Sequence, residues 1–240
     1  EEPFSAQENS AVDQLLKMAT AIDTSNNTKK LTTASPLAQG KKHVAKGQQS
    51  TTGYYKTNVS CGLQELHAYI EAEDVSSEYI ERFEEDVNNH HSVRYYALSY
   101  PTPVSDREWN VSIVTKKIDD ETIVVVCVPC FIEEKARNVH PDRVRAEVRS
   151  MYRLTKISDI TTRVEFYAQL EFGGYAPRWI INRELPKFMS APTKWQEHFQ
   201  HLRSLRDLSP EDGVAMGTML TTLVKNRKSV ESRLTAFVSK

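Results

Sequence analysis

The sequence of 240 residues contains no run of about 18 or more apolar residues, the length that a membrane-spanning helix needs. Its first residues, EEPFSAQENS, have neither the basic nor the apolar region of a secretory signal peptide. They also lack an initiator methionine, so we expect the chain to be part of a longer protein. The net charge of −1 gives no electrostatic footprint for nucleic acid, so no nucleic-acid partner is predicted.

Cysteine is scarce, and the motifs of known catalytic and metal sites are missing. Cys61, Cys127 and Cys130 form no disulfide framework of a secreted protein, so a reducing, cytoplasmic location is expected. Cys127-Val-Pro-Cys130 has no second Cys pair to complete a metal site, and it ends an apolar strand rather than starting a helix, so we interpret it as structural. His90-His91 has no ligand spacing with the other histidines and is interpreted as a solvated turn. No phosphate-binding loop, nucleophile elbow or Ser-His-Asp arrangement is present, so we predict a protein that is not an enzyme and has no cofactor.

What is present is the composition of a globular protein, with 39% hydrophobic and 26% charged residues. Apolar spacing predicts a helix over Ser10–Ile22, capped by Ser10 with Asp13, and another over Leu63–Ala72. Acidic residues on one side suggest a further short helix over Tyr79–Val87. Strands are predicted, weakly for the first two, over these ranges: Lys29–Ala34, Val44–Thr52, Tyr54–Val59, Val93–Tyr100, Arg107–Lys116, Thr122–Val128, Val144–Thr155 and Thr161–Phe172. Strands in series between terminal helices indicate an α+β fold with an antiparallel sheet.

The stretch Thr161–Leu205 carries the clearest pattern. Apolar residues alternate with polar ones from Val164 to Phe172, as in a strand with one buried face. Gly173 and Gly174 then permit a sharp reversal. A long amphipathic helix follows from Trp179, with interruptions near Pro186 and Pro192.

Three stretches resemble one known family: VSDREW at Val104–Trp109, VRAEVRSMYRL at Val144–Leu154 and VEFYAQLEFGGYAPRWIINRELPKF at Val164–Phe188. They are similar to sequences of START domains, the steroidogenic acute regulatory protein-related lipid-transfer domains, over roughly Lys41–Leu205. The resemblance implies the helix-grip fold (START-like, Bet v 1-like), in which a curved antiparallel sheet wraps around a long C-terminal helix. It also implies non-covalent binding, transfer or sensing of a lipid or another hydrophobic molecule, with transient contact with membrane surfaces.

On this fold, the strand faces and the underside of the helix would enclose a pocket, for which we predict eleven lining residues: Trp109, Val111, Ile113, Val148, Tyr152, Phe166, Ala168, Leu170, Trp179, Arg183 and Met189. Arg107 and Arg183 are the candidates to contact a polar ligand group. Alternatively, Asp106 and Arg107 form a structural ion pair. A further alternative is that these residues fill a solid core, and that the domain is an interaction or regulatory module of a larger multidomain protein.

Residues 1–205 are expected to form the ligand-binding domain, with an N-terminal helix and polar segment over 1–40. Residues 206–240 would then be a C-terminal helical extension. Ser209-Pro210-Glu211-Asp212 begins one predicted helix there, and the extension would pack on the domain or lead into another domain.

Overall fold

The structure is a computed structural model that describes residues 3–25, 28–31, 38–43, 50–72, 80–132 and 140–206. Helices and strands alternate in the order that the sequence suggests, with one exception near residue 80. The helices are α1 (Ala6–Asp23), α2 (Leu63–Ala72), α3 (Arg178–Met189) and α4 (Ala191–Arg206). The strands are β1 (Thr28–Leu31), β2 (Gln39–His43), β3 (Ser50–Val59), β4 (Glu81–Asn88), β5 (His91–Leu98), β6 (Arg107–Asp119), β7 (Thr122–Pro129), β8 (Val144–Arg145), β9 (Glu147–Ser158) and β10 (Thr161–Glu171).

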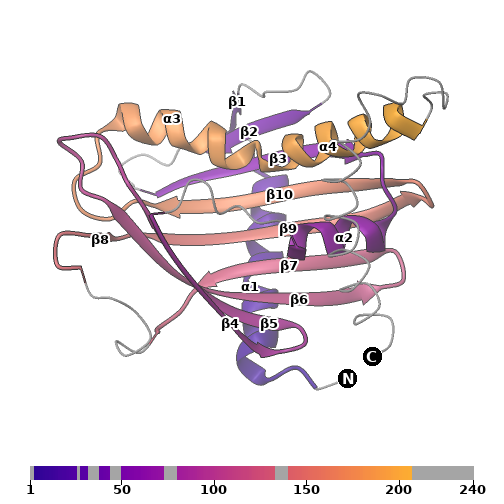
Figure 1. The fold of residues 1–240 in the computed structure, drawn as a ribbon, viewed down its shortest axis with the longest axis horizontal. Helices are drawn as coiled ribbons and strands as arrows, with labels where there is room; N and C mark the ends of the chain where they lie inside the picture. The colour runs from indigo at the N-terminus through magenta and orange to yellow at the C-terminus, as the bar shows by residue number, and fades with distance from the viewer. Residues whose placement is uncertain are drawn as a thin grey trace, which may run out of the picture.

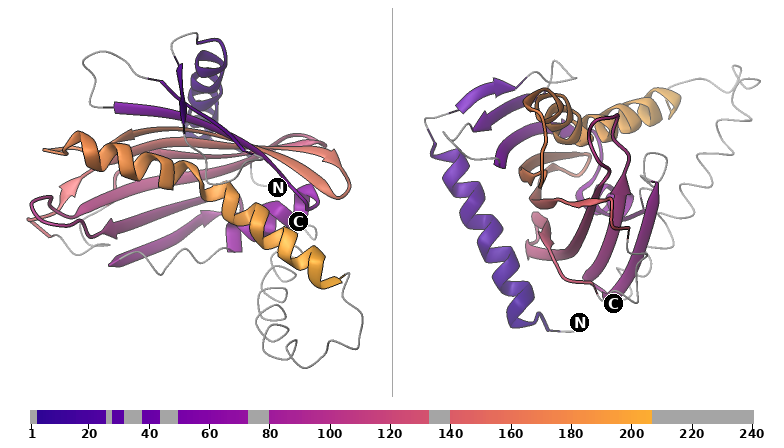
Figure 2. Two further views of the ribbon diagram at one scale, coloured as in Figure 1. Left: turned by 90° about the horizontal axis from the view of Figure 1, so that it is seen from above. Right: turned by 90° about the vertical axis from the view of Figure 1, so that its left-hand side faces the viewer.

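All ten strands belong to one sheet, whose order is β1-β2-β3-β10-β9-β7-β6-β5-β4, with β8 paired to β6. Every neighbouring pair along this path is antiparallel. The sheet curves, with α3 and α4 across its concave side and α1 behind it (Figures 1 and 2). The predicted helix-grip arrangement is therefore confirmed.

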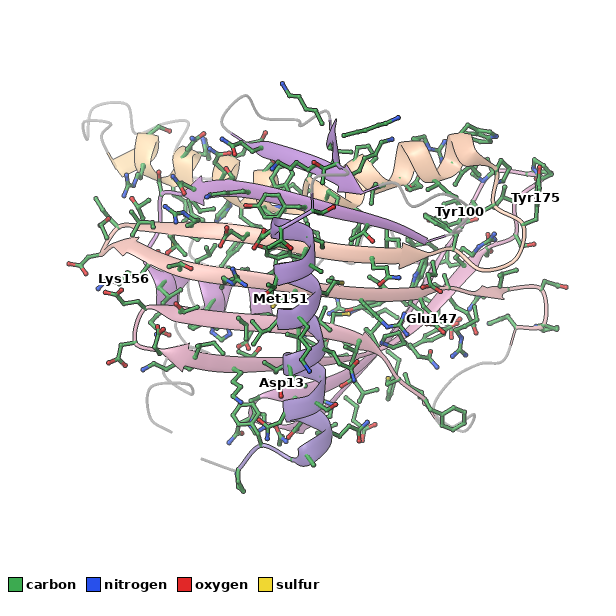
Figure 3. The ribbon with its side chains drawn as sticks, turned by 180° about the vertical axis from the view of Figure 1, so that it is seen from behind. Asp13, Tyr100, Glu147, Met151, Lys156 and Tyr175 are labelled. Atoms are coloured by element: carbon green, nitrogen blue, oxygen red, sulfur yellow. The ribbon has the colours of Figure 1, made fainter. Side chains whose placement is uncertain are left out.

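The alternation of side chains along β10 divides the core into two layers. Phe166 and Ala168 face the concave side, where they are fully buried with Ile180 and Met189 of α3. The intervening Tyr167 faces the convex side and packs in a second cluster with residues of α1. Figure 3 shows α1 crossing the back of the sheet over Met151. Because each face of the sheet is covered by a helix, both faces carry apolar side chains.

Helix α1 begins four residues earlier than its apolar spacing predicts. Ser5 is the N-cap, and its hydroxyl accepts the N–H of Glu8 at 3.2 Å. The Glu8 carboxylate in turn accepts the N–H of Ser5 at 2.6 Å, which completes a capping box. The prediction that Ser10 and Asp13 cap this helix is therefore wrong, because the reciprocal pair lies at Ser5 and Glu8.

The C-terminal helical segment is divided in two at Ser190, where the backbone N–H bonds back to α3 carbonyls. Pro186 lies inside α3 and Pro192 lies in the first turn of α4. At the division, Met189 packs directly on β3: a Cβ added to Gly53 would lie only 2.9 Å from the Met189 sulfur. The absence of a side chain at Gly53 thus lets the helices approach the sheet.

The predicted helix over Tyr79–Val87 is wrong, because Glu81–Asn88 form the edge strand β4. Its pairing partner is β5, and Glu84 stands directly opposite Arg94 across the two strands. This cross-strand charge pair favours a strand at a place where acidic residues alone suggested a helix face.

Other predictions hold or lie outside the described residues. The helix Leu63–Ala72 is confirmed with the predicted bounds, and the predicted first strand corresponds to β1. Most of the predicted strand Val44–Thr52 and the extension after residue 206 lie outside the described residues. Among the described helices, none has the length and apolarity needed to cross a membrane.

Candidate functional site

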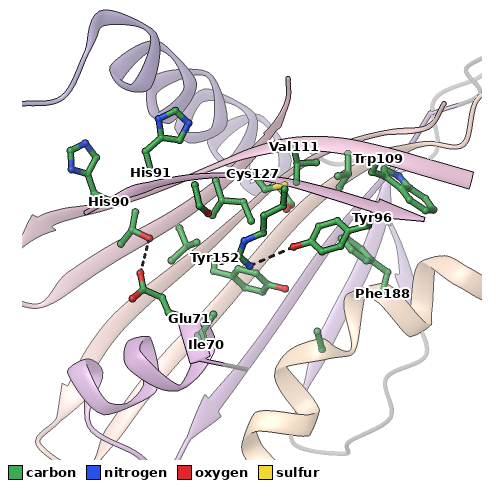
Figure 4. Close-up of a pocket in the computed structure, with 18 of the residues that line it drawn as sticks. Ile70, Glu71, His90, His91, Tyr96, Trp109, Val111, Cys127, Tyr152 and Phe188 are labelled. Carbon is green, nitrogen blue, oxygen red and sulfur yellow. Dashed lines mark hydrogen bonds between the residues drawn. The ribbon is translucent and has the colours of Figure 1, made fainter. Parts of the chain in front are cut away.

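A cavity of about 1000 Å³ lies between the concave face of the sheet and the helices α2, α3 and α4. Alternate residues of the four strands β5, β6, β7 and β9 form its floor, and Phe188 and Trp195 approach from the helices. Figure 4 shows side chains from opposite walls, among them Trp109, Tyr152 and Phe188, directed into the same space. The volume is within the range of small-molecule sites in proteins.

The cavity does not extend over the whole concave face. On the β3 and β10 side, Tyr55, Phe166 and Ala168 are sealed by the buried residues of α3. Tyr152 and Phe166 mark the boundary, because their rings stack with centroids 4.1 Å apart while only Tyr152 borders the cavity. Helix α3 therefore packs directly on one part of the concave face, and the cavity separates the helices from the other part.

Arg94 of β5 is a charged side chain that borders the cavity among the strands of its floor. Its guanidinium forms an ion pair with Glu84 at 2.7 Å and donates to the Tyr96 hydroxyl at 3.5 Å. Burial by itself would lower the pKa of Arg94, but Tyr96 and Glu84 outweigh it and raise the pKa, so the group is charged at neutral pH. Its Nε atom is buried without a hydrogen-bond partner. One N–H donor beside the cavity is thus unsatisfied.

One end of the cavity is closed by the first turn of α1 and the β4–β5 turn. His91 Nδ1 lies 2.9 Å from Glu8, and His91 Nε2 lies 2.7 Å from the Ser112 hydroxyl. Next to it, the His90 ring packs 4.1 Å from the ring of Phe4. The predicted turn is present at Asn89 and His90, but the prediction that it is solvated is wrong, because both histidine side chains are mostly buried and face Glu8 of α1.

Glu8 is 4% exposed, and its surroundings control its charge. Burial alone would raise the pKa of this carboxyl. The backbone and hydroxyl of Ser5, together with Asn88 and His90, outweigh burial and lower the pKa of Glu8 to about 2. A charged, hydrogen-bonded carboxylate thus anchors α1 at neutral pH.

Six of the eleven residues predicted to line a pocket border the cavity. They come from two strands of the floor, β6 and β9, and from the adjoining part of β10: Trp109, Val111, Ile113, Val148, Tyr152 and Leu170. They share the face that strand alternation assigns to them.

The other five predicted residues lie elsewhere. Phe166, Ala168 and Met189 are fully buried in the core where α3 rests on the sheet. Trp179 and Arg183 point away from the sheet, and Trp179 is 52% exposed. The Arg183 guanidinium lies 5.4 Å from the Trp179 ring centroid and pairs with Glu184 at 2.7 Å. The sequence reading placed them under the helix, whereas Ile180, Leu185 and Met189 form its buried side.

Arg107 is 1% exposed, and it is not among the residues that border the cavity. Its Nε donates to the Phe172 carbonyl at 2.7 Å, and a terminal nitrogen donates to the Tyr175 carbonyl at 3.0 Å. A further bond reaches the Ser105 carbonyl. Arg107 therefore fastens the loop between β10 and α3, which is a structural role rather than the predicted ligand contact.

Asp106 does not act as the partner proposed for Arg107. Its carboxylate accepts the Ser99 hydroxyl at 2.9 Å and the Tyr100 N–H at 3.1 Å. The loop before β6 is thus held by Asp106, while the loop after β10 is held by Arg107.

The cysteines are free. Cys127 borders the cavity, and burial raises the pKa of its thiol to about 12. Burial also raises the pKa of the Cys130 thiol, to about 11. A protonated thiol is a poor nucleophile and metal ligand. Within the described part of the chain, no group of His, Cys, Asp or Glu side chains is arranged to hold a metal ion.

The sequence reasoning missed the contribution of β5, whose alternate residues Ser92, Arg94, Tyr96 and Leu98 all border the cavity. Their period of two was a usable signal, because these positions share one face of a strand. The residues of β7 gave no such signal, since that strand is apolar on both faces.

Comparison with known proteins identifies the architecture. A search of curated proteins finds no match. Among solved structures, human StAR-related lipid transfer protein 5 is similar with a TM-score of 0.64 and 11% identity, covering 83% of this chain and 100% of that one. Human STARD10 has a TM-score of 0.61 and 14% identity, covering 88% and 87%. The human StarD13 lipid transfer and protein localization domain has a TM-score of 0.59 and 13% identity, covering 82% and 98%.

At these identities the structural matches show the fold alone. The family assignment comes from the sequence: a family model described as START domain matches residues 71–207, more than half of the 240 residues. The matched range includes the strands that form the cavity floor and both helices that cover the sheet. The chain therefore belongs to the START domain family, whose members bind lipids or other hydrophobic ligands.

Proposed function

We propose that this protein binds a lipid or another hydrophobic small molecule, non-covalently and without chemical conversion, in the cavity between the sheet and helices α2, α3 and α4. The observation that carries the proposal is a cavity of about 1000 Å³ with a largely apolar floor that the charged side chain of Arg94 borders. Protein interiors are close-packed, so a space of this size on a largely apolar surface suits a ligand. Residues 1–205 would form the binding unit, and transfer between membranes would require the ligand to leave the same cavity.

The apolar part of the ligand would lie on the floor formed by Trp109, Val111, Ile113, Val148 and Tyr152. Removing apolar surface from water stabilises a complex by about 25 cal/mol per Å². A hydrocarbon tail or ring system that covers these side chains therefore supplies the affinity, and it requires no covalent bond.

Arg94 would orient the polar end of the ligand. Its side chain borders the cavity and is 18% exposed, and a hydrogen bond from a charged guanidinium to a ligand oxygen contributes roughly 1.5–3 kcal/mol. Because Glu84 already neutralises the guanidinium, a neutral acceptor such as a hydroxyl, ester or amide oxygen suits the site better than a phosphate.

The proposal is tested by native mass spectrometry of the purified protein, followed by exchange with labelled lipids of several classes. Ile113→Trp should fill the cavity floor and abolish ligand uptake. Ile118→Trp, on the same strand but 46% exposed outside the cavity, is the matched control and should bind like the wild type.

Arg94→Met should weaken the binding of a neutral lipid about tenfold, the effect of one hydrogen bond of about 1.4 kcal/mol. Glu84 is not orphaned by this change, because Arg82 also pairs with it at 2.6 Å. If no lipid class binds, or if Ile113→Trp and Ile118→Trp behave alike, the cavity is not a ligand site and the domain is an interaction module instead.

A further inference from the structure

Positive charge is concentrated in one part of this chain. Between Asp23 and Glu65 the sequence contains six lysines and no acidic residue, although the whole chain has a net charge of −1. In the structure, four of these lysines lie in the β1–β2 hairpin: Lys29, Lys30, Lys41 and Lys42.

The hairpin places these lysines against one another. Lys29 stands directly opposite Lys42, and Lys30 stands directly opposite Lys41. Like charges at facing positions of antiparallel strands destabilise the pairing. Within the described ranges, none of the four lysines has an acidic ion-pair partner. Two unfavourable pairs in one short hairpin indicate a site where a negatively charged partner would offset the repulsion.

The opposite edge of the sheet carries acidic side chains, of which Glu81 and Glu84 are paired with arginines. Strand β4 is the last strand of the sheet order, and its eight residues include four acidic side chains and only Arg82 as a base. The hairpin begins the sheet order at the other edge. A charge separation of this kind turns a protein so that its basic edge faces an anionic surface.

Helix α3 extends the basic edge. Met189 at the end of α3 packs on Gly53, and Gly53 pairs with Lys42, so the helix and the hairpin are neighbours. Figure 1 shows β1, β2, α3 and α4 along the same upper edge of the molecule. On α3, Trp179, Arg183 and Lys187 are exposed, and Tyr175 just before the helix is 78% exposed.

We propose that the β1–β2 hairpin and the exposed side of α3 form a docking surface for an anionic phospholipid bilayer. The lysines would face the lipid phosphates, while Trp179 and Tyr175 would enter the interfacial layer that tryptophan and tyrosine prefer. These aromatic residues favour a bilayer over a nucleic acid. The inference rests on the proposed function, because Lys187 and Phe188 of the same helix border the cavity, and docking would bring its ligand close.

The test is flotation with vesicles of phosphatidylcholine alone and of phosphatidylcholine with phosphatidylserine. The protein should bind only the anionic vesicles, and added salt should weaken the binding. Lys41→Glu combined with Lys42→Glu should weaken it at least ~30-fold, since each lysine near an anionic surface contributes about 1 kcal/mol. This variant should not unfold, because each new carboxylate faces Lys30 or Lys29 across the hairpin.

The control variant combines Lys17→Glu, on α1 behind the sheet, with Lys156→Glu, near the end of β9. It changes the net charge by the same amount as the hairpin variant, and it should bind vesicles like the wild type. Ligand occupancy, measured in parallel by native mass spectrometry, should be the same in both variants, so a failure of the cavity proposal is seen separately. Equal vesicle binding by the two variants, no preference for phosphatidylserine, or tighter lysine-dependent binding to duplex DNA would each overturn the docking surface.

Discussion

Substitution of Arg107 distinguishes two roles for this residue: a structural role in holding a loop, and the ligand contact that the sequence predicts. Its guanidinium is 1% exposed and donates to the carbonyls of Phe172, Tyr175 and Ser105. These bonds tie β6 to the loop that begins α3. Arg107→Met keeps most of the side-chain volume and removes every one of them.

The magnitude follows from the bonds and from the charge. Hydrogen bonds to a charged donor contribute about 1.5–3 kcal/mol each, and at least two carbonyls would be left buried without a partner. Removing a buried charge offsets part of this loss, since burial already disfavours the cation and lowers the pKa of Arg107. We therefore expect a net loss of ~3 kcal/mol in the free energy of unfolding, within the range for broken buried networks.

Urea denaturation followed by tryptophan fluorescence measures this loss, and ligand affinity is measured on the same samples below the transition. Arg183→Met is the matched control: the side chain is 52% exposed, and the change should cost ~0.5 kcal/mol or less. Wild-type stability of Arg107→Met together with a large loss of ligand affinity would refute the structural assignment and restore the ligand contact.

Two other substitutions test the anchoring of the helices. Glu8→Gln keeps an acceptor for the Ser5 N–H but removes the charge that Ser5, Asn88 and the histidines stabilise, so it should lower the unfolding free energy by ~1–2 kcal/mol at neutral pH. The pKa of Glu8 falls from 4.5 to about 2 on folding, so its contribution to stability is present above pH 4.5 and is lost as the pH falls toward 2. The unfolding free energy of the variant should therefore depend less on pH in that window than that of the wild type. The same pH dependence of stability in both proteins would contradict this. Gly53→Ala should lower the unfolding free energy by ~1–2 kcal/mol, because the new methyl group meets the Met189 sulfur at 2.9 Å. Met189→Ala should then cost less stability in the Gly53→Ala background than in the wild type. Additive effects of the two substitutions in thermal denaturation would disprove this contact.

Local patterns predicted elements where one physical signal dominates. The alternation from Val164 to Phe172, followed by Gly173 with φ +62° and Gly174 with φ +48°, specifies a strand that must turn sharply. Helix α2 was predicted to the residue from its apolar spacing. The acidic segment before residue 88 was misread because its structure depends on pairing with β5, which no local pattern contains.

In the candidate site, too, part of the arrangement follows from local sequence patterns and part only from tertiary contacts. Alternation placed Val148 and Ala168 on the same concave face, and both are there. Only the position of α3 decides that Val148 borders the cavity while Ala168 is sealed beneath the helix. The rotation of α3, which exposes Trp179 and Arg183, likewise depends on which of its residues meet the sheet.

The sequence by itself determined the family, the order of most elements and the face of each strand, because these depend on periodicity, turn residues and family-specific stretches. The tertiary structure decided where the cavity lies, since α3 and α4 pack on β3 and β10 and leave a space between the helices and the strands β5, β6, β7 and β9. It also decided that Arg94 rather than Arg107 faces the cavity, and that lysines far apart in the chain stand opposite one another in the β1–β2 hairpin. These outcomes depend on contacts between distant segments, which local sequence patterns do not encode.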